Sequence, residues 1–395
     1  MPSPEDFLLN TKAGDVNGPE DADLLSTEHE EGATGVEQED VGPEATITEP
    51  FDPTLIRVAT NALTIDLLTA RLREKEIDLA PDFQRMGGIW SDVAQSRLIE
   101  SILIRIPLPA LYLDATDEDR WIVVDGLQRL TALKRFINTK ELRLTGLEFL
   151  SSLNGKSYSE LARNLQRRIM ETQIVVYLIE RGTPSEVKFN IFKRINTGGL
   201  PLSPQEIRHA LNQGTATRTL AELARSQEFR SATANGIKDY RMADRECVLR
   251  YFAFRIRPYS SYRGKDLDGF LNQAMVALNQ MPESDLGRLV IEFKRAMKTA
   301  YRLFGRDAFR KRYLSGHSRY PLNKALFEVW SVNLSQLNQP DSDRLVDRRD
   351  QVKQAFMNLM NNTEFDRSIS QSTGDPARIR TRFSEIEQLI RMVLS

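Results

Sequence analysis

Four residues, Asp125, Gly126, Gln128 and Arg129, form the segment with the clearest potential for chemistry. They follow the short apolar run 121–124, and apolar residues then recur at helical spacing, which predicts a strand, a tight turn and a helix. Such a turn directs the free N–H groups of the first helical turn, and the positive end of the helix dipole, to one place. With an arginine beside them, these amides favour a phosphate from a nucleotide or from a DNA backbone.

Asp125 supplies the carboxylate at this turn. A carboxylate there can hold a cation such as Mg²⁺ beside the phosphates, or it can orient a water molecule. Gln128 can contact a base, a sugar or a water molecule. We therefore assign Asp125, Gln128 and Arg129 as candidate catalytic residues, and Asp125 as the candidate metal ligand.

Two further polar clusters complete a possible phosphate site. One is residues 83–85, in a glycine-containing loop before a helix, and the other is residues 193–199, followed by Glu206. Arginine can bind phosphate oxygens in a fork, and amide side chains can contact a base or a sugar. The prediction requires these side chains to meet at one helix end. The predicted phosphate-binding residues are Gln84, Arg85, Gly126, Arg129, Arg194 and Asn196.

The order and content of these clusters resemble the GmrSD-type family. Its hallmark is Asp-Gly-Gln-Gln-Arg after a strand, and this chain has Leu127 in place of the usual first glutamine. Residues 83–85 with Trp90 resemble an upstream Gln-Arg…Trp element of the family, and residues 192–198 with Leu202 and Glu206 resemble its Phe-x-Arg-Ile-Asn element. The resemblance covers about residues 60–215, and the region from residue 242 resembles the helical half of stand-alone members.

This resemblance implies a ParB/sulfiredoxin-like fold in the N-terminal domain. It also implies binding or hydrolysis of a nucleoside triphosphate, contact with DNA, and a role in restriction and phage defence against foreign or modified DNA. In the ParB relatives a Gly-x-x-Arg turn and an Asn-x-x-Arg helix hold the triphosphate together. Gly126 with Arg129 fits the first of these, whereas Asn190 and Arg194 are four residues apart rather than three.

Several family members carry an HNH nuclease module, which requires paired histidines. The three histidines of this chain, His29, His209 and His317, are far apart and lie in unrelated sequence contexts. No zinc-type spacing is present either. The sequence therefore predicts a stand-alone form without an HNH module. It leaves open whether cleavage is intrinsic or supplied by a partner, and the candidate partners besides DNA are a partner nuclease and a second copy of the chain.

Other candidate residues lie in the second half of the chain. A dense basic run is the best candidate for contact with the DNA backbone, and the basic and aromatic run 251–259 fits a core helix almost as well as a nucleic-acid surface. Cys247 lies within a predicted helix beside Val248 and Leu249, which favours a buried structural thiol over a nucleophile. The predicted DNA-binding residues are Arg306, Arg310, Lys311 and Arg312.

Charge is segregated along the chain, although its formal net charge is only −1. Residues 1–50 carry 14 acidic side chains and one lysine, so the remainder has a net charge of +12, which favours polyanionic partners such as DNA. We expect residues 1–50 to be a disordered leader, acting either as a solubilising tail or as a nucleic-acid mimic that screens the basic body. The single cysteine, the lack of an apolar run of about 18 residues and the N-terminal composition predict a soluble cytoplasmic protein that does not enter the membrane.

The apolar patterns predict two domains after the leader. Residues 55–182 mix helices and short strands, which indicates a ParB-like α+β domain, and residues 183–395 carry helical patterns almost throughout. Expected strands are 77–79, 111–113, 121–124 and 174–179; expected helices are 65–73, 91–105, 127–138, 185–195, one starting at Ser203, and segments near 243–257, 267–281, 285–304, 321–337, 344–361 and 376–394. The fold class is therefore α+β, followed by an all-helical C-terminal domain.

The leading hypothesis is a nucleotide-binding, DNA-associated nucleoside triphosphatase. A second hypothesis uses the same pocket as a metal-dependent DNA endonuclease, with Asp125 and Glu206 as candidate metal ligands. A third is a non-enzymatic DNA-binding regulatory module whose pocket clamps the DNA backbone.

Overall fold

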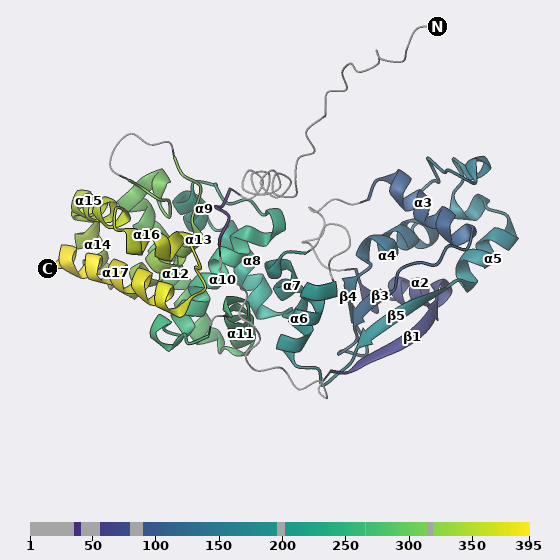
Figure 1. Ribbon diagram of the computed structural model, residues 1–395, viewed down its shortest axis with the longest axis horizontal. Coiled ribbons are helices and arrows are strands. Elements are labelled where there is room, and N and C mark those ends of the chain that lie inside the picture. The colour runs from purple at the N-terminus through teal and green to yellow at the C-terminus, as the bar shows by residue number, and fades with distance from the viewer. Residues whose placement is uncertain (1–34, 41–55, 80–89, 196–201, 265, 314–318) are drawn as a thin grey trace, which may run out of the picture.

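The computed structural model describes residues 35–40, 56–79, 90–195, 202–264, 266–313 and 319–395. These residues form a sheet domain (residues 56–179) and a helical domain (residues 215–394), each with its own hydrophobic core, joined by two helices (Figure 1). The predicted fold class, an α+β domain followed by an all-helical region, is confirmed. Among the described helices, none has the length and apolar character that a membrane span requires.

Five strands form one mixed sheet in the order β1-β5-β3-β4-β2. Pairing is antiparallel between β1 and β5 and between β3 and β4, and parallel between β5 and β3 and between β4 and β2. The strands are β1 (Val58–Thr64), β2 (Ile77–Asp78), β3 (Leu111–Asp114), β4 (Trp121–Asp125) and β5 (Gln173–Ile179).

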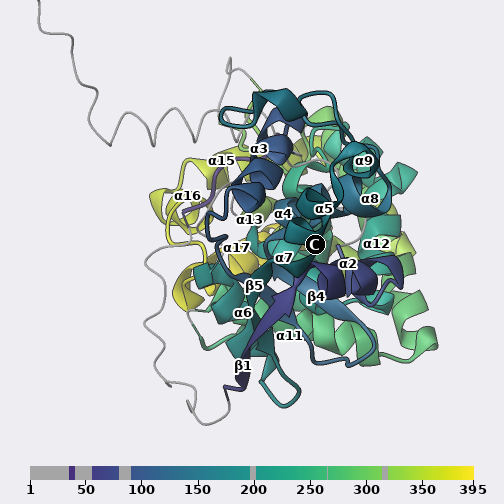
Figure 2. The same ribbon diagram turned by 90° about the vertical axis from the view of Figure 1, so that its right-hand side faces the viewer.

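Four helices cover one face of this sheet, because alternate strand residues are apolar and point to that side (Figures 1 and 2). They are α2 (Ile65–Arg73), α3 (Asp92–Leu103), α4 (Leu127–Leu133), which continues as a π-helical turn (Lys134–Asn138), and α5 (Arg163–Glu171). Leu111, Val123 and Val176 from the sheet are buried against Leu68 and Leu130 from the helices. Ser91 accepts a hydrogen bond from the backbone N–H of Ala94 and caps α3, as the sequence predicts.

The two joining helices lie on the other face of the sheet, at the side of the helical domain (Figure 1). They are α6 (Ser185–Ile195) and α7 (Pro204–Leu211). Phe189 and Phe192 of α6 pack with Val124 and Ile179 of the sheet in a small separate core. α7 begins with the predicted capping box, in which Ser203 and Glu206 satisfy each other's backbone N–H groups.

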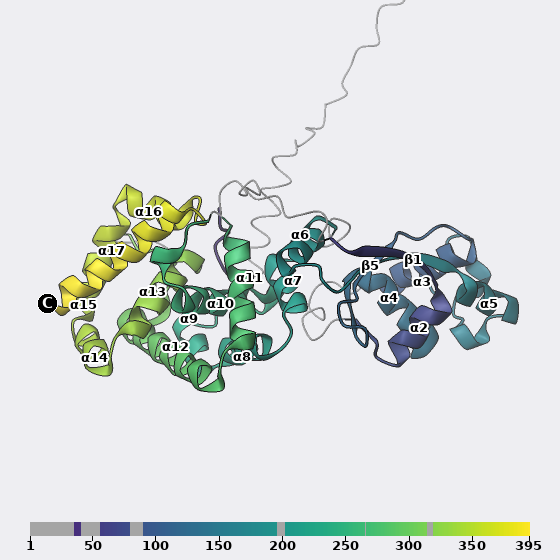
Figure 3. The ribbon, with the colours of Figure 1, turned by 90° about the horizontal axis from the view of Figure 1, so that it is seen from below.

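The helical domain is built around α12 and α13, which pack side by side, and α17 lies along α13, α14, α15 and α16 (Figure 3). Its helices are α8 (Thr215–Arg225), α9 (Gln227–Thr233), α10 (Ala243–Ile256), α11 (Leu267–Gln280), α12 (Glu283–Phe304), α13 (Lys324–Gln336), α14 (Gln339–Asp347), α15 (Arg349–Met360), α16 (Thr363–Ser370) and α17 (Pro376–Leu394). Phe293, Phe327 and Trp330 are among its fully buried side chains.

The acidic leader differs from the prediction at one place. Residues 35–40, expected to be disordered, pack against the helical domain, where Val36 pairs with Leu322 and is 3% exposed. The disorder prediction is wrong for these six residues, because Val36 joins a hydrophobic core and charged partners satisfy the acidic side chains. The rest of the predicted leader lies outside the described residues.

Candidate functional site

The predicted strand, turn and helix around Asp125 are present. β4 ends at Asp125, Gly126 occupies the cap position of α4, and the Gly126 carbonyl accepts the first helical hydrogen bond from Leu130 at 2.9 Å. Gly126 has φ +100°, a left-handed conformation that favours glycine. A β-carbon at Gly126 would also lie 2.1 Å from the Leu111 side chain, so β3 leaves room only for a glycine. Leu127, where the resemblance leads us to expect glutamine, packs against the core of the sheet domain.

Arg129 is held inside this turn. Its Nη2 donates to the Asp125 carboxylate at 2.8 Å, and its Nη1 donates to the backbone carbonyls of Ala110, at 3.1 Å, and of Pro109. Only 8% of the residue is exposed, and burial lowers the pKa of its guanidinium against the opposing effect of Asp125. These bonds use three of the five N–H donors of a guanidinium. Arg129 therefore fastens the turn to the residues just before β3, and two of its N–H donors lie outside these bonds.

The side chain of Asp125 is 27% exposed and lies beside an aromatic pair. Tyr112 of β3 is opposite Asp125 in the sheet, and its ring stacks on that of Tyr177 in β5, with centroids 4.7 Å apart. Burial, together with Tyr177 and Asp125, raises the pKa of Tyr112. Sequence reasoning missed both tyrosines, because their position next to the turn follows from strand register, which no local pattern indicates.

Gln128 positions a neighbouring segment. Its Oε1 accepts a hydrogen bond from the backbone N–H of Trp90 at 3.1 Å, at the start of the chain that leads into α3. Gln84 and Arg85, the two predicted phosphate-binding residues just upstream, lie outside the described residues. The bond from Trp90 places the start of the chain that leads into α3 beside the Asp125–Arg129 turn.

Arg194 lies in the last turn of α6 and is exposed. α6 contacts β4, and Lys188 on the same helix pairs with Asp114 of β3 at 3.1 Å, which fixes α6 across the sheet. Within the described part of the chain, no hydrogen bond or ion pair joins Arg194 to the Asp125–Arg129 turn. Asn196 falls outside the described residues. The structure thus brings together Asp125, Gly126, Gln128 and Arg129, with Arg194 on a helix that packs against the same sheet.

Metal-binding residues are scarce in this site. No group of three or more His, Cys, Asp or Glu side chains is arranged to hold a metal in the described ranges. Glu206, the second candidate ligand of the endonuclease hypothesis, instead accepts a hydrogen bond from the Ser203 backbone N–H at 2.6 Å and lies 3.6 Å from the Arg241 guanidinium. His209 is 6% exposed on α7, while His29 and His317 lie outside the described residues.

The predicted DNA-binding run 306–312 does not form one exposed basic patch. Arg310 is 6% exposed and donates to the Tyr320 carbonyl, and burial lowers its pKa to about 10. Lys311 pairs with Glu37 at 2.5 Å, whereas Arg306 is exposed and Arg312 lies 3.6 Å from Asp307. The backbone pairing of Arg310 with Leu322 turns its side chain inward, so only Arg306 and Arg312 of the predicted set face solvent.

The run 251–259 is a core helix for most of its length. Tyr251, Phe252 and Phe254 are at most 2% exposed, and Tyr259 stacks on Phe383. Core packing therefore explains these aromatic residues without a nucleic-acid partner.

Cys247 on α10 is 1% exposed, and burial raises the pKa of its thiol to about 12. Since the thiolate is the reactive form, we expect almost no reaction with a disulfide reagent such as DTNB at about pH 8 in the native protein. In denaturing guanidinium the one thiol of the chain should react fully. Rapid labelling of the native protein would contradict the structural assignment of Cys247.

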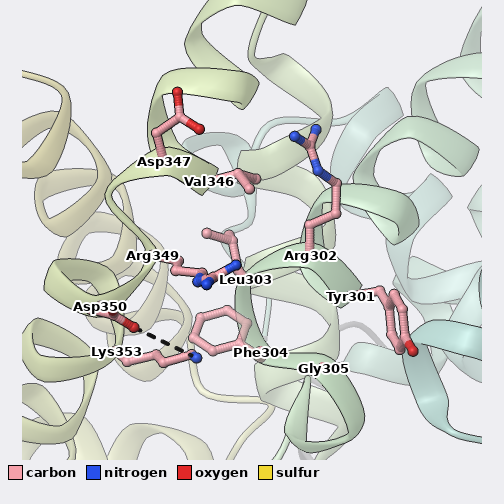
Figure 4. Close-up of a pocket in the computed structure, with 10 residues that line it drawn as sticks. All are labelled: Tyr301, Arg302, Leu303, Phe304, Gly305, Val346, Asp347, Arg349, Asp350 and Lys353. Carbon is pink, nitrogen blue, oxygen red and sulfur yellow. Dashed lines mark ion pairs between the residues drawn. The ribbon is translucent and has the colours of Figure 1, made fainter.

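A shallow pocket of about 830 Å³ lies in the helical domain, apart from the predicted site (Figure 4). Arg302, Arg349 and Lys353 line it together with Asp347 and Asp350. Two of its cations already have acidic partners, since Lys353 lies 3.9 Å from Asp350 and Arg302 pairs with Asp343 at 2.6 Å. None of the residues predicted for the site lines this pocket.

The site lies within a region that matches a known family. Residues 66–212 match the model of the GmrSD restriction endonuclease, N-terminal domain. The match begins in α2, ends just after α7 and includes the Asp125–Arg129 turn and Arg194. No curated protein is similar to the chain at a significant level. The matched region covers most of the sheet domain and the two helices that follow it, so this part of the chain is similar to the GmrSD N-terminal domain, and the helical domain follows it.

Proposed function

We propose that this chain is a nucleoside triphosphatase that acts with DNA in the restriction of foreign or modified DNA. One observation carries the proposal: the left-handed Gly126 places Asp125 and Arg129 side by side at the start of α4, within the region that matches a restriction endonuclease family. The family match supports the association with DNA, and the geometry of the turn supports an anionic ligand.

In this proposal the phosphates bind at the turn. The backbone N–H groups that open α4 and the two remaining donors of Arg129 face one phosphate group, and Arg194 reaches another from α6. Gln84, Arg85 and Asn196 are assigned to the same ligand by their sequence context alone. Gln128 orients the segment before α3 through its bond to Trp90.

Magnesium fits this turn as an ion that is shared with the nucleotide. The turn offers Asp125, a half-buried carboxylate, and Mg²⁺ sites in phosphate-binding proteins commonly use one or two carboxylates together with substrate phosphates. When bound, the ion would neutralise charge on the phosphate oxygens. Asp125 would have to divide its oxygens between Arg129 and the ion, so the ion should bind weakly without nucleotide.

The contribution of the protein to hydrolysis would be positioning and charge stabilisation, as is usual in phosphoryl transfer. Asp125 orients a water molecule, Arg129 keeps Asp125 in place, and Arg194 stabilises the negative charge that develops on the transferred group. Since the described residues contain no cluster of metal ligands for a nuclease, we propose that a partner nuclease or a second copy of the chain supplies DNA cleavage.

The decisive test uses two variants in a nucleotide-hydrolysis panel, with and without DNA. We expect Arg194→Met to weaken nucleotide binding by about 10-fold or more, because a charge-assisted hydrogen bond to phosphate contributes roughly 1.5–3 kcal/mol. Asp125→Asn should mainly lower kcat, because it keeps the shape of the side chain and removes its charge. Arg129→Ala is a weaker test, since Arg129 also holds the turn to the residues just before β3.

Arg167→Met is the matched control, because the Arg167 side chain on α5 is 69% exposed and pairs only loosely with Glu171, at 3.8 Å. It should leave hydrolysis unchanged. Salt-sensitive DNA binding without turnover of any nucleotide would contradict the triphosphatase and favour a regulatory module. Mg²⁺-dependent nicking of a plasmid without nucleotide, abolished in Asp125→Asn, would favour the endonuclease instead.

A further inference from the structure

Residues 35–40, the acidic strap, run along the surface of the helical domain as an extended segment, the dark purple trace near α9 in Figure 1. Its backbone is tied at both ends. Glu37 N–H donates to the Leu322 carbonyl at 2.7 Å, and the Thr373 N–H donates to the Asp40 carbonyl at 2.9 Å. Between these bonds, Val36 is buried in the hydrophobic core of the domain.

The strap fits its groove closely. Gly35 has φ +73°, and a β-carbon there would lie 1.8 Å from the Gly236 carbonyl oxygen, so the chain enters the groove where a side chain could not pass. Two backbone bonds to Leu322, one on either side of Val36, then set the register of the next residues. That register brings Glu37 and Glu39 to cationic side chains of the domain.

Glu39 anchors the strap through a forked ion pair. The Arg250 guanidinium donates to both carboxylate oxygens of Glu39, at 2.9 Å to Oε1 and also to Oε2, and the Thr373 hydroxyl donates to Oε1 at 2.5 Å. The side chains of Arg250 and Glu39 are 2% and 9% exposed. Burial raises the pKa of Glu39, but Arg250 and Lys324 outweigh it and hold the pKa below its usual value.

Glu37 covers a second cation nearer to the surface. Its Oε1 lies 2.5 Å from Lys311 Nζ, and its Oε2 accepts from Asn323 Nδ2 at 3.1 Å. Lys311 belongs to the basic run that also contains the exposed Arg306 and the half-buried Arg312. With Glu37 in place, the side chain of Lys311 is only 10% exposed and its charge is paired.

The cations that the strap covers, Arg250 and Lys311, lie among donors that suit an anion. A guanidinium fork with a hydroxyl, and an ammonium with an amide N–H, are donor sets that bind carboxylate and phosphate oxygens alike. If the strap leaves, Lys311 loses its carboxylate partner Glu37. The buried charge cluster then has more cations than carboxylates, because Glu246 and Glu328 remain beside Arg250, Arg382 and Lys324. An unpaired charge in such a place is costly, so the domain should accept another anion there.

We propose that the acidic strap is an intramolecular competitor of the nucleic-acid backbone on the helical domain. Glu39 anchors it, and Glu37 covers Lys311, which joins Arg306 and Arg312 in binding DNA phosphates when the strap is displaced. This inference rests on the proposed association with DNA. It accounts for the burial of Lys311, which sequence analysis expects to contact DNA, and it assigns a role to part of the acidic leader.

The test is Glu37→Gln, assayed for DNA binding over a series of salt concentrations. Glutamine keeps an oxygen for Asn323 and leaves the Glu39 anchor intact, so the fold should be retained. We expect Glu37→Gln to bind DNA about five-fold more tightly at low salt, and the slope of log K against log salt to steepen by about 0.9, the value for one added phosphate contact. Adding Lys311→Met to this variant should return both quantities to those of the parent.

Asp285→Asn is the matched control, since Asp285 pairs with Arg288 at the start of α12, the opposite end of that helix from Arg306, and its loss changes the net charge equally. A similar gain in the control, or an unchanged affinity in Glu37→Gln when the parent binds DNA, would overturn the inference. A lower melting temperature of Glu37→Gln with unaltered DNA affinity would also overturn it, because the strap would then have only a structural role. If parent and variants all fail to bind DNA, the proposed DNA association fails as well.

Discussion

Arg382→Met should destabilise the helical domain by about 3–5 kcal/mol, because it breaks the buried Arg382–Glu328 ion pair and leaves the Glu328 carboxylate in the core without this partner. Arg382 and Glu328 are both 0% exposed. The guanidinium of Arg382 donates to Glu328 Oε1 through Nε, at 2.8 Å, and through Nη2, and its Nη1 donates to the Ser368 carbonyl at 3.0 Å. Methionine fills much of the same volume but offers no donor to either acceptor.

The expected loss is visible as a melting temperature. For a domain of this size, about 3–5 kcal/mol corresponds to a fall of roughly 6–20 °C. Arg391→Met is the control, because Arg391 lies on the same helix and its side chain, paired with Glu387, is 76% exposed. Exposed pairs contribute about 0–1 kcal/mol, so the control should melt close to the parent. Equal melting temperatures for the two variants would show that the Arg382–Glu328 pair is not needed in the core.

Local chemistry is what the sequence predicts well. Helix starts at Ser91 and Ser203 depend on a side-chain oxygen reaching a backbone N–H a few residues ahead, and both appear where expected. The strand–turn–helix around Asp125 likewise depends on a short apolar run, a glycine and a helical repeat. Each of these signals lies within about one helical turn of the feature that it predicts.

Elements without a strong local pattern were missed. β1 (Val58–Thr64) is an edge strand whose residues are mostly exposed, so it shows no alternation of buried and polar residues. The expected helix at 344–361 is two helices, α14 and α15, which meet at Arg348, where φ −93° and ψ 21° end one helix and begin the next. The side chain of Arg348 donates to the Val393 carbonyl of α17, a distant partner that the local sequence does not reveal.

Contacts between distant segments could not be predicted at all. Glu39 and Arg250 are 211 positions apart, and only the folded chain shows that an acidic leader residue completes a buried charge cluster. The same reason explains Arg310, whose basic neighbours favour a surface position while its pairing with Leu322 turns it inward. Composition indicated a basic body with an acidic leader, but folding decides which charges meet.

Gly126→Ala should destabilise the sheet domain by about 2–5 kcal/mol, the sum of two separate costs. A non-glycine residue in a left-handed conformation costs roughly 1–2 kcal/mol, and crowding in a packed core costs roughly 1–3 kcal/mol. The second cost arises because the new β-carbon would lie 2.1 Å from Leu111 Cδ2 and 3.2 Å from Arg129 Nη2. Leu111 is fully buried in the core, so its side chain cannot move aside without repacking.

Gly155→Ala separates these two costs. Gly155 lies in the same domain with φ +82°, and a β-carbon there would meet nothing within 4 Å, so only the conformational cost applies. We expect calorimetry to show a fall of roughly 10 °C or more for Gly126→Ala and of a few degrees for Gly155→Ala. Equal falls in melting temperature for the two variants would mean that the Leu111 side chain moves aside at little cost. In that case Gly126 would be needed for its backbone conformation alone, and larger residues that accept a left-handed conformation, such as asparagine, should then be tolerated between Asp125 and α4.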